Sequence, residues 1–245
     1  MKYPCLRLMV AVLGFGAVGL GVGGLGGCGL ISSDVTNFDL TLPDKKFTID
    51  ASGWNVDATK ANTYLGLSCA SNATLCSSAV AQACPMGCSG TCNAAKTCDL
   101  SLDVSLSQKV DLVAEKPELK SINDEPVIKV SIDSVTYEVT SNTLNVATPT
   151  IDIYVGSTSV VDPTDPTNPG TLIGTIPPIP AGQTTSGRQM LMFTPTGKDE
   201  LVKIMSTFKT PFNVLVGSSL LVTAGQPVPM GKLESVVHIT AHAGL

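Results

Sequence analysis

The sequence predicts a mainly β fold: an antiparallel β-sandwich with one short amphipathic helix and a disulfide-rich insertion, preceded by a cleaved signal peptide. Three observations predict this class. Short runs of alternating apolar residues recur along the chain and are separated by glycine, proline and asparagine, which is typical of a sandwich or barrel. Six of the eight cysteines lie between Cys69 and Cys98. The first 27 residues place two cations ahead of a long uncharged run.

Residues 1–27 are predicted to be a secretory signal. Lys2 and Arg7 are their only charges, and residues 8–27 carry none. A retained transmembrane helix is the alternative, because about 20 apolar residues span a bilayer. The many glycines in the run weigh against it, since each interior glycine costs about 1 kcal/mol of helix propensity relative to alanine. The order of charge, apolar run and small residues is that of a signal peptide.

The tetrad Leu25-Gly26-Gly27-Cys28 resembles the lipobox of bacterial lipoproteins. The resemblance implies that the leader is removed before Cys28, that the Cys28 thiol is lipidated, and that residues 28–34 form a lipid-anchored tether. It also implies a place in the cell envelope, and Gly29, rather than an aspartate, implies sorting to the outer membrane. Stable anchoring requires more than one acyl chain, because a single chain binds a membrane only marginally.

Composition limits the partners of the mature chain. Removing 27 of the 245 residues leaves 218 and takes the net charge from −5 to −7, a length that suits one domain over 35–245. The remaining lysines and arginines are not clustered, so we expect no nucleic-acid binding. The run Gly14-Phe15-Gly16-Ala17-Val18-Gly19 matches a dinucleotide-binding pattern, but the glycines that follow exclude the helix that such a site needs. We therefore predict no cofactor, with the membrane as partner through the lipid and an unknown protein partner in the envelope.

The cysteines that remain after processing are predicted to form three disulfides. They are Cys69, Cys76, Cys84, Cys88, Cys92 and Cys98. Their surroundings hold few large apolar side chains, so covalent closure must supply order, and 15 connectivities are open. A metal site is the alternative, because Cys84, Cys88 and Cys92 are spaced by four. Their spacing misses the usual zinc and cluster patterns, and Pro85 would break the aligning helix, so no metal is predicted.

Period-two alternation places the strands. Val35 to Asp50 is predicted to form a first pair of strands about a Pro43–Lys46 turn, and the cysteine-rich insertion covers about 51–99, with a helix candidate at 72–83. Leu100 to Leu112 holds apolar residues at even positions, which predicts a strand with one buried face. Further strands are predicted at 127–140, 144–155, 171–176, 189–194, 213–216, 220–222 and 233–241. A change of buried parity predicts a bulge near Asp133-Ser134.

One helix interrupts the strands. Gly197 to Phe208 carries Leu201, Ile204, Met205 and Phe208 at helical spacing, with acidic residues in its first turn. We expect this helix to lie across one open end or face of the sandwich.

The chain from Val135 onward resembles the late-embryogenesis-abundant, water-stress and hypersensitive-response type of β-sandwich. The residues that carry the resemblance are Tyr137-Glu138-Val139 with Asn142-Thr143-Leu144, Ile151-Asp152-Ile153-Tyr154-Val155, Leu172-Ile173-Gly174 and Ile179-Pro180-Ala181-Gly182. Over about 135–245 it implies a seven-stranded sandwich with one helix and no catalytic residue. The cysteine insertion and the loop 162–170 depart from the family pattern.

Two other patterns could carry chemistry. His238 and His242 lie in a predicted strand, where they would face outward about 13 Å apart, too far to share one metal ion, and no acidic residue is evident to orient them. The loop from Asp162 to Gly170 offers oxygen ligands, but its three prolines favour a rigid, solvated connection over a calcium site. No nucleophile elbow occurs, so no catalytic residue is predicted.

These observations predict a lipid-anchored cell-envelope protein of non-enzymatic, structural or interaction type. An alternative is a binder of a small or apolar ligand at the helix-covered end of the sandwich, with Met190, Met192 and Met205 lining the cavity. A third hypothesis is a hydrolase whose site is not recognised.

Overall fold

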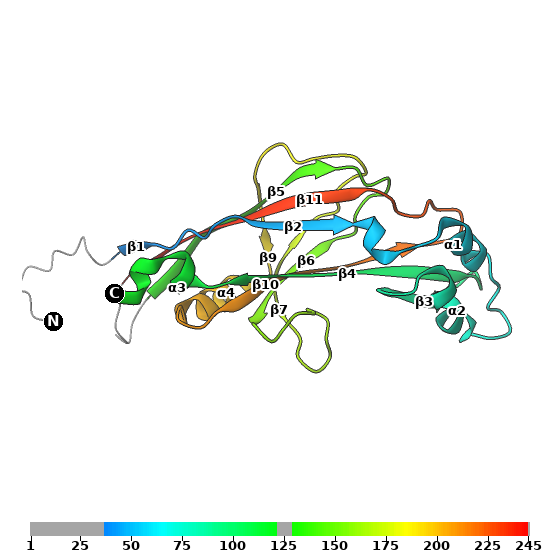
Figure 1. Cartoon of the computed structure of the whole chain (residues 1–245), viewed down its shortest axis with the longest axis horizontal. Helices are drawn as coiled ribbons and strands as arrows, with labels where there is room; N and C mark the ends of the chain where they lie inside the picture. Colours follow the sequence, from blue (N-terminus) through cyan, green and yellow to red (C-terminus); the bar gives the residue numbers. More distant parts are fainter. Residues whose placement is uncertain (1–36, 122–128, 245) are drawn as a thin grey trace, which may run out of the picture. The chain divides into compact units, whose positions relative to one another are not determined.

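A computed structural model of the chain describes residues 37–121 and 129–244, which belong to the unit 35–245 (Figure 1). The strands are β1 (Asn37–Asp39), β2 (Lys45–Asp50), β3 (Cys88–Cys92), β4 (Cys98–Val110), β5 (Lys129–Asn142), β6 (Ile151–Ser157), β7 (Thr171–Ile176), β8 (Gln189–Met190), β9 (Met192–Phe193), β10 (Phe212–Val222) and β11 (Lys232–Gly244). The helices are α1 (Ala58–Leu65), α2 (Leu75–Ala83), α3 (Leu112–Glu115) and α4 (Gly197–Ser206), with 3-10 turns at Ala51–Trp54 and Pro117–Ser121.

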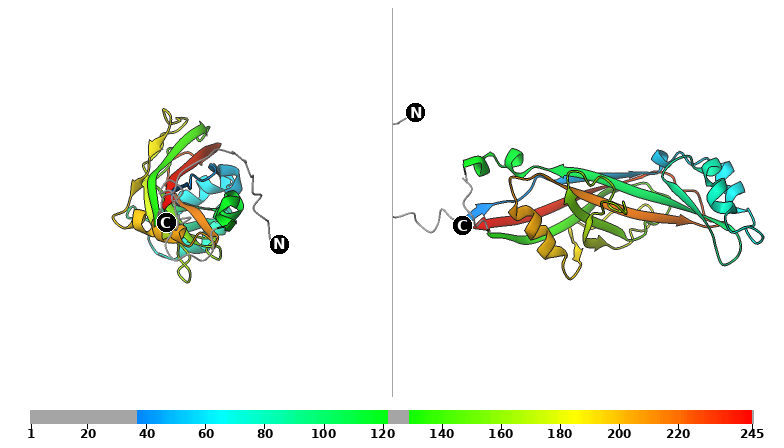
Figure 2. Two further views of the ribbon diagram at one scale, coloured as in Figure 1. Left: turned by 90° about the vertical axis from the view of Figure 1, so that its left-hand side faces the viewer. Right: turned by 90° about the horizontal axis from the view of Figure 1, so that it is seen from below.

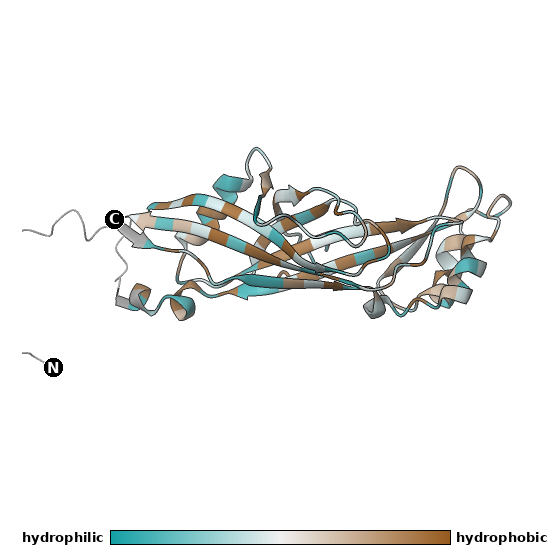
Figure 3. Cartoon of the chain, turned by 90° about the horizontal axis from the view of Figure 1, so that it is seen from above, coloured by the Kyte–Doolittle hydropathy of each residue, from teal (hydrophilic) through white to brown (hydrophobic). Residues whose placement is uncertain are grey.

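The strands form two antiparallel sheets, which confirms the mainly β sandwich. The first sheet has the order β1-β11-β5-β8, with β2 also paired to β11, and the second has the order β3-β4-β10-β6-β7-β9. Apolar and polar residues alternate along the strands (Figure 3). The inward side chains of both sheets, such as Val139, Ile153 and Val237, belong to one apolar core.

The first two strands do not form the predicted hairpin. β1 pairs with residues 242–244 of β11, and β2 pairs with residues 232–237 of the same strand in the same direction. Between them the Leu40 and Leu42 amides donate to carbonyls of β11. Residues 37–50 therefore form one interrupted edge strand. Pro43 interrupts the ladder at a sheet edge, where a residue without an N–H is tolerated.

Other strands follow the sequence closely. The predicted bulge is confirmed, because the register between β11 and β5 shifts where Thr240 faces Ser134 and Ala241 faces Ile132, which leaves Asp133 without a ladder partner. The predicted strands 213–216 and 220–222 are one strand, β10. Residues 129–244 hold seven described strands and α4.

One side of the sandwich is closed by α4 and by the segment that follows β8. Helix α4 contacts β5 of the first sheet and β7 of the second, and its own Leu201 and Met205 side chains are fully buried. The chain crosses from β8 in the first sheet to β9 in the second at the buried Leu191. This confirms that the predicted helix covers a face of the sandwich, although it ends at Ser206 rather than Phe208.

The cysteine-rich segment forms the end of the unit opposite β1, around α1, α2 and β3 (Figures 1 and 2). All six cysteines are paired: Cys69 with Cys92, Cys76 with Cys98, and Cys84 with Cys88. The Cα atoms of the pairs are 6.0, 5.3 and 6.1 Å apart, within the usual disulfide range. The predicted disulfide staple is confirmed, and its connectivity is assigned.

The staple is accompanied by helices, one of which the sequence analysis did not predict. The predicted helix 72–83 is α2, which begins three residues later. Helix α1 was missed, although the Asp57 side chain accepts hydrogen bonds from the amides of Thr59 and Lys60 in the manner of an N-cap. The short helix α3 is capped in the same way by Asp111. More than one helix therefore accompanies the two sheets.

A buried tyrosine joins the helices to the sheet. The Tyr64 hydroxyl of α1 lies 3.1 Å from the Cys76 carbonyl oxygen and 3.2 Å from that of Asp99. Burial raises the pKa of Tyr64, so the hydroxyl remains a donor at neutral pH. Gly90 of β3 lies against it, and a Cβ at this position would overlap the hydroxyl.

We expect Gly90→Ala to lower the free energy of unfolding by about 1–2 kcal/mol, because the added methyl group must displace Tyr64. Urea denaturation measures the change. Gly53→Ala is the matched control, since a Cβ at Gly53 meets nothing within 4 Å. Equal stabilities of the two variants would contradict the packing of Tyr64 on β3.

Candidate functional site

The side of the sandwich opposite α4 is left partly open between β2 and β4. Strand β3 pairs with residues 98–102 of β4 and leaves the rest of that edge free. The amide of Asp103 donates to the Gly87 carbonyl, and the Asp103 carbonyl accepts from Trp54. The backbone N–H and C=O of Asp103 therefore point away from β10. Along a strand, the backbone N–H and C=O groups of successive residues point to opposite sides. Those of Ser105 and Ser107 therefore point away from β10, as those of Asp103 do. Their backbone groups have no hydrogen-bond partner on that side among the described residues.

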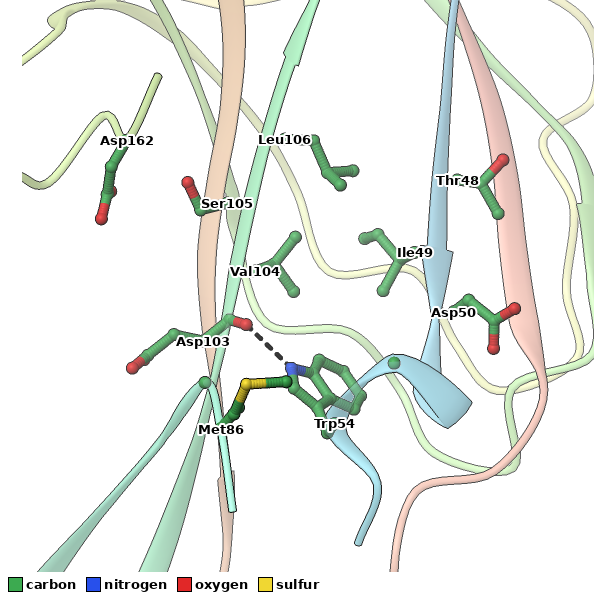
Figure 4. A pocket seen from close by; sticks show the side chains of 12 residues that line it. Thr48, Ile49, Asp50, Trp54, Met86, Asp103, Val104, Ser105, Leu106 and Asp162 are labelled. Atoms are coloured by element: carbon green, nitrogen blue, oxygen red, sulfur yellow. Dashed lines mark hydrogen bonds between the residues drawn. The ribbon is translucent and has the colours of Figure 1, made fainter. Parts of the chain in front are cut away.

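A groove of about 540 Å³ lies between the two edges (Figure 4). Its lining consists of Thr48, Ile49, Asp50, Gly53, Trp54, Met86, Gly87, Asp103, Val104, Ser105, Leu106 and Asp162. Ile49 of β2 faces Val104 and Leu106 of β4 across the groove. Val104 and Leu106 are half-buried, whereas Leu102 on the same face of β4 is fully buried. Two apolar side chains on the inward face of β4, Val104 and Leu106, are thus partly exposed along the groove.

Trp54 forms one end of the groove. The indole Nε1 donates a 2.8 Å hydrogen bond to the Asp103 carbonyl, which directs the nitrogen-bearing edge of the ring toward the beginning of the free edge. Trp54 is the only tryptophan of the chain and is buried, while Met86 beside it is 67 % exposed. A buried aromatic ring next to a flexible methionine can adapt to an apolar ligand.

The rim of the groove is acidic. Asp50, Asp103 and Asp162 line it, and no lysine, arginine or histidine is among its lining residues. The side chain and amide of Ser52 donate to the Asp50 carboxylate and lower the pKa of Asp50, so this group stays ionised at neutral pH. Asp162 accepts from the amide and hydroxyl of Thr164. The groove therefore favours cationic ligands over anionic ones.

Several residues singled out in the sequence lie elsewhere. Cys28 lies outside the described residues. The sulfurs of Cys69, Cys76 and Cys92 lie within 4.8 Å of one another, because two bridges are adjacent. In the bridged state these sulfurs are not the thiolates that bind zinc.

The structure corrects the expectation for the histidines. Val237, Ile239 and Ala241 are buried as predicted, but the side chain of His238 is also buried, at 9 % exposure. Each histidine has an acidic partner: His238 Nδ1 lies 2.6 Å from Asp44, and His242 Nδ1 lies 2.9 Å from Asp133. These partners come from the Pro43 interruption and the β5 bulge, which bring distant residues to β11. No nucleophilic side chain hydrogen-bonds either histidine within residues 37–121 and 129–244.

The structure also corrects the ligand cavity expected at α4. Met205 is fully buried in the core, whereas Met190 and Met192 are more than half exposed on the surface. The cavity beside α4, about 370 Å³, is lined by residues such as Glu200, Lys203 and Val160 and by none of the three methionines.

The loop 162–170 holds its carboxylates in local turns. Asp162 and Asp165 each accept hydrogen bonds from the threonine two residues later. These hydrogen bonds form local turns, and the role of the loop as a rigid connection stays a prediction.

Sequence reasoning did not identify the groove. The only signal was the single tryptophan in a segment of small residues, and its partners come from β2, β4 and the loop at Asp162. The chain was compared with protein-family models, with curated proteins and with solved structures, and nothing matched. None of the helices in the described part of the chain is long and apolar enough to cross a membrane.

Proposed function

We propose that this chain is a lipid-anchored cell-envelope protein of non-enzymatic, interaction type, held at the outer membrane through Cys28. The observation that carries the proposal is that β1, the first described strand after Cys28, lies at the end of the unit opposite the cysteine-rich segment. Cys28 precedes β1 by nine residues, and β1 pairs with the last residues of β11. The cysteine-rich end adjoins the first residues of β11, about 40 Å away along a strand of 13 residues. A tether at Cys28 would hold this end away from the membrane.

The disulfides support an exported location. Three bridges within 30 residues are typical of proteins that fold in an oxidising compartment, and rare in the cytosol. The groove supports an interaction role, because it combines free strand edges with a partly exposed apolar floor.

Membrane fractionation of cells that express the full-length chain tests the anchor. We expect Cys28→Ser to move the protein from the membrane fraction to the soluble fraction, because the serine hydroxyl does not receive the lipid. Cys5→Ser is the matched control, since Cys5 lies in the predicted leader, and it should leave the distribution unchanged. A Cys28→Ser protein that still sediments with membranes would overturn the proposal.

A further inference from the structure

We propose that the groove between β2 and β4 binds an extended, basic segment of a partner polypeptide, which adds as a strand to the free edge of β4. This inference names the kind of partner and rests on the proposed interaction function.

The backbone of β4 supplies the hydrogen-bonding edge. Residues 100–110 pair with β10 on one side, whereas β3 covers the other side only as far as Leu102. The Trp54 indole already donates a hydrogen bond to the Asp103 carbonyl, so the free edge begins at Ser105. An extended peptide beside this edge would satisfy the backbone groups of Ser105 and Ser107, as in strand addition to other exposed sheet edges.

The side chains supply the second element of recognition. Alternate residues of an added strand face the same side. One set would lie over Val104 and Leu106, which are half-buried, and beside the buried Ile49, which faces them across the groove. Apolar residues at alternate positions of the partner would bury this floor.

Charge decides between the possible occupants. The other set of side chains would lie near Asp50, Asp103 and Asp162, which favours lysine and arginine. A second copy of this chain would bring the same carboxylates to the same edge in a symmetric contact, and like charges across an interface are unfavourable. The occupant is therefore a basic partner rather than a second copy.

The binding test uses the full-length chain in detergent and a blocked peptide, Thr-Val-Lys-Val-Lys-Val-Thr. Because Trp54 is the only tryptophan and lines the groove, its fluorescence reports occupancy. We expect a saturable change with this peptide and binding at least about tenfold weaker when glutamates replace its lysines. Methylating the alternate amide nitrogens that would face β4 should weaken binding to a similar extent, because it removes the ladder hydrogen bonds.

Matched variants distinguish the effect of the groove carboxylates on peptide binding from the effect of the net charge of the protein. The combination Asp50→Asn, Asp103→Asn and Asp162→Asn should weaken binding about tenfold. The control, Asp39→Asn with Asp57→Asn and Asp165→Asn, removes the same number of charges at exposed or half-buried positions outside the groove and should leave binding unchanged. Ser105→Pro should weaken binding without unfolding the chain, because the Ser105 amide points away from β10.

Three results would overturn the inference: no saturable response to the lysine peptide, equal binding of the glutamate peptide, or equal binding of the methylated peptide. A dimer of the chain that excludes the peptide would overturn it as well. Failure of the anchor is distinguishable, because Cys28→Ser should bind the peptide as the unchanged protein does even though it leaves the membrane.

Discussion

Replacing Cys76 and Cys98 together with alanine is expected to lower the free energy of unfolding by about 3 kcal/mol or more. The bridge links α2 to the beginning of β4 and closes a loop with a sequence separation of 22 residues. Chain entropy alone gives about 3 kcal/mol for a loop of this length. Both cysteines are fully buried, so their loss also leaves unfilled space in the core. Urea denaturation of the non-reduced proteins measures the difference.

The paired variant Cys84→Ala with Cys88→Ala is the control for this experiment. Its bridge spans a separation of four residues, for which the same estimate is about 2 kcal/mol. Cys84 is buried but Cys88 is partly exposed, so less packing is lost than at the fully buried Cys76 and Cys98. If the short bridge proved as important as the Cys76–Cys98 bridge, the idea that the latter fastens the cysteine-rich end to the second sheet would be wrong.

Glu115→Leu is expected to be the second most destabilising change, at about 2–3 kcal/mol. Glu115 of α3 lies 2.6 Å from the Nζ of Lys45, which points between the sheets from β2, and the two side chains are 17 % and 10 % exposed. Removing the carboxylate leaves the buried ammonium group without its partner. Adding Lys45→Met should restore most of the lost stability, because the double variant buries no charge.

An exposed ion pair provides the comparison. Glu200 and Lys203 lie 3.3 Å apart on α4, with the lysine side chain 77 % exposed. Glu200→Leu should change stability by less than about 1 kcal/mol. If both glutamate variants lost the same stability, burial of the Lys45 pair would not be the cause.

The sequence pattern predicted elements whose structure depends on nearby residues. The alternation after Leu100, the parity change at Asp133 and the apolar spacing of 197–208 each predicted an element that the structure contains. These patterns were sufficient because one face of each element is buried against the core.

The pattern failed where distant residues decide the structure. Residues 37–50 alternate like a hairpin, but both halves pair with β11, nearly 200 positions later. The prediction for the environment of His238 was wrong for the same reason, since Asp44 reaches His238 only because β2 and the residues before it pair with β11. The groove has the same origin, because its two walls are adjacent only in the folded sandwich.

The intact mass of the natural protein, measured without reduction, tests most directly whether the chain is an exported, lipidated protein. The account predicts a polypeptide that begins at Cys28, carries acyl chains on that residue, and gains the mass of six hydrogens on reduction of its three bridges. A chain that still carries residues 1–27, or an unmodified thiol at Cys28, would contradict it.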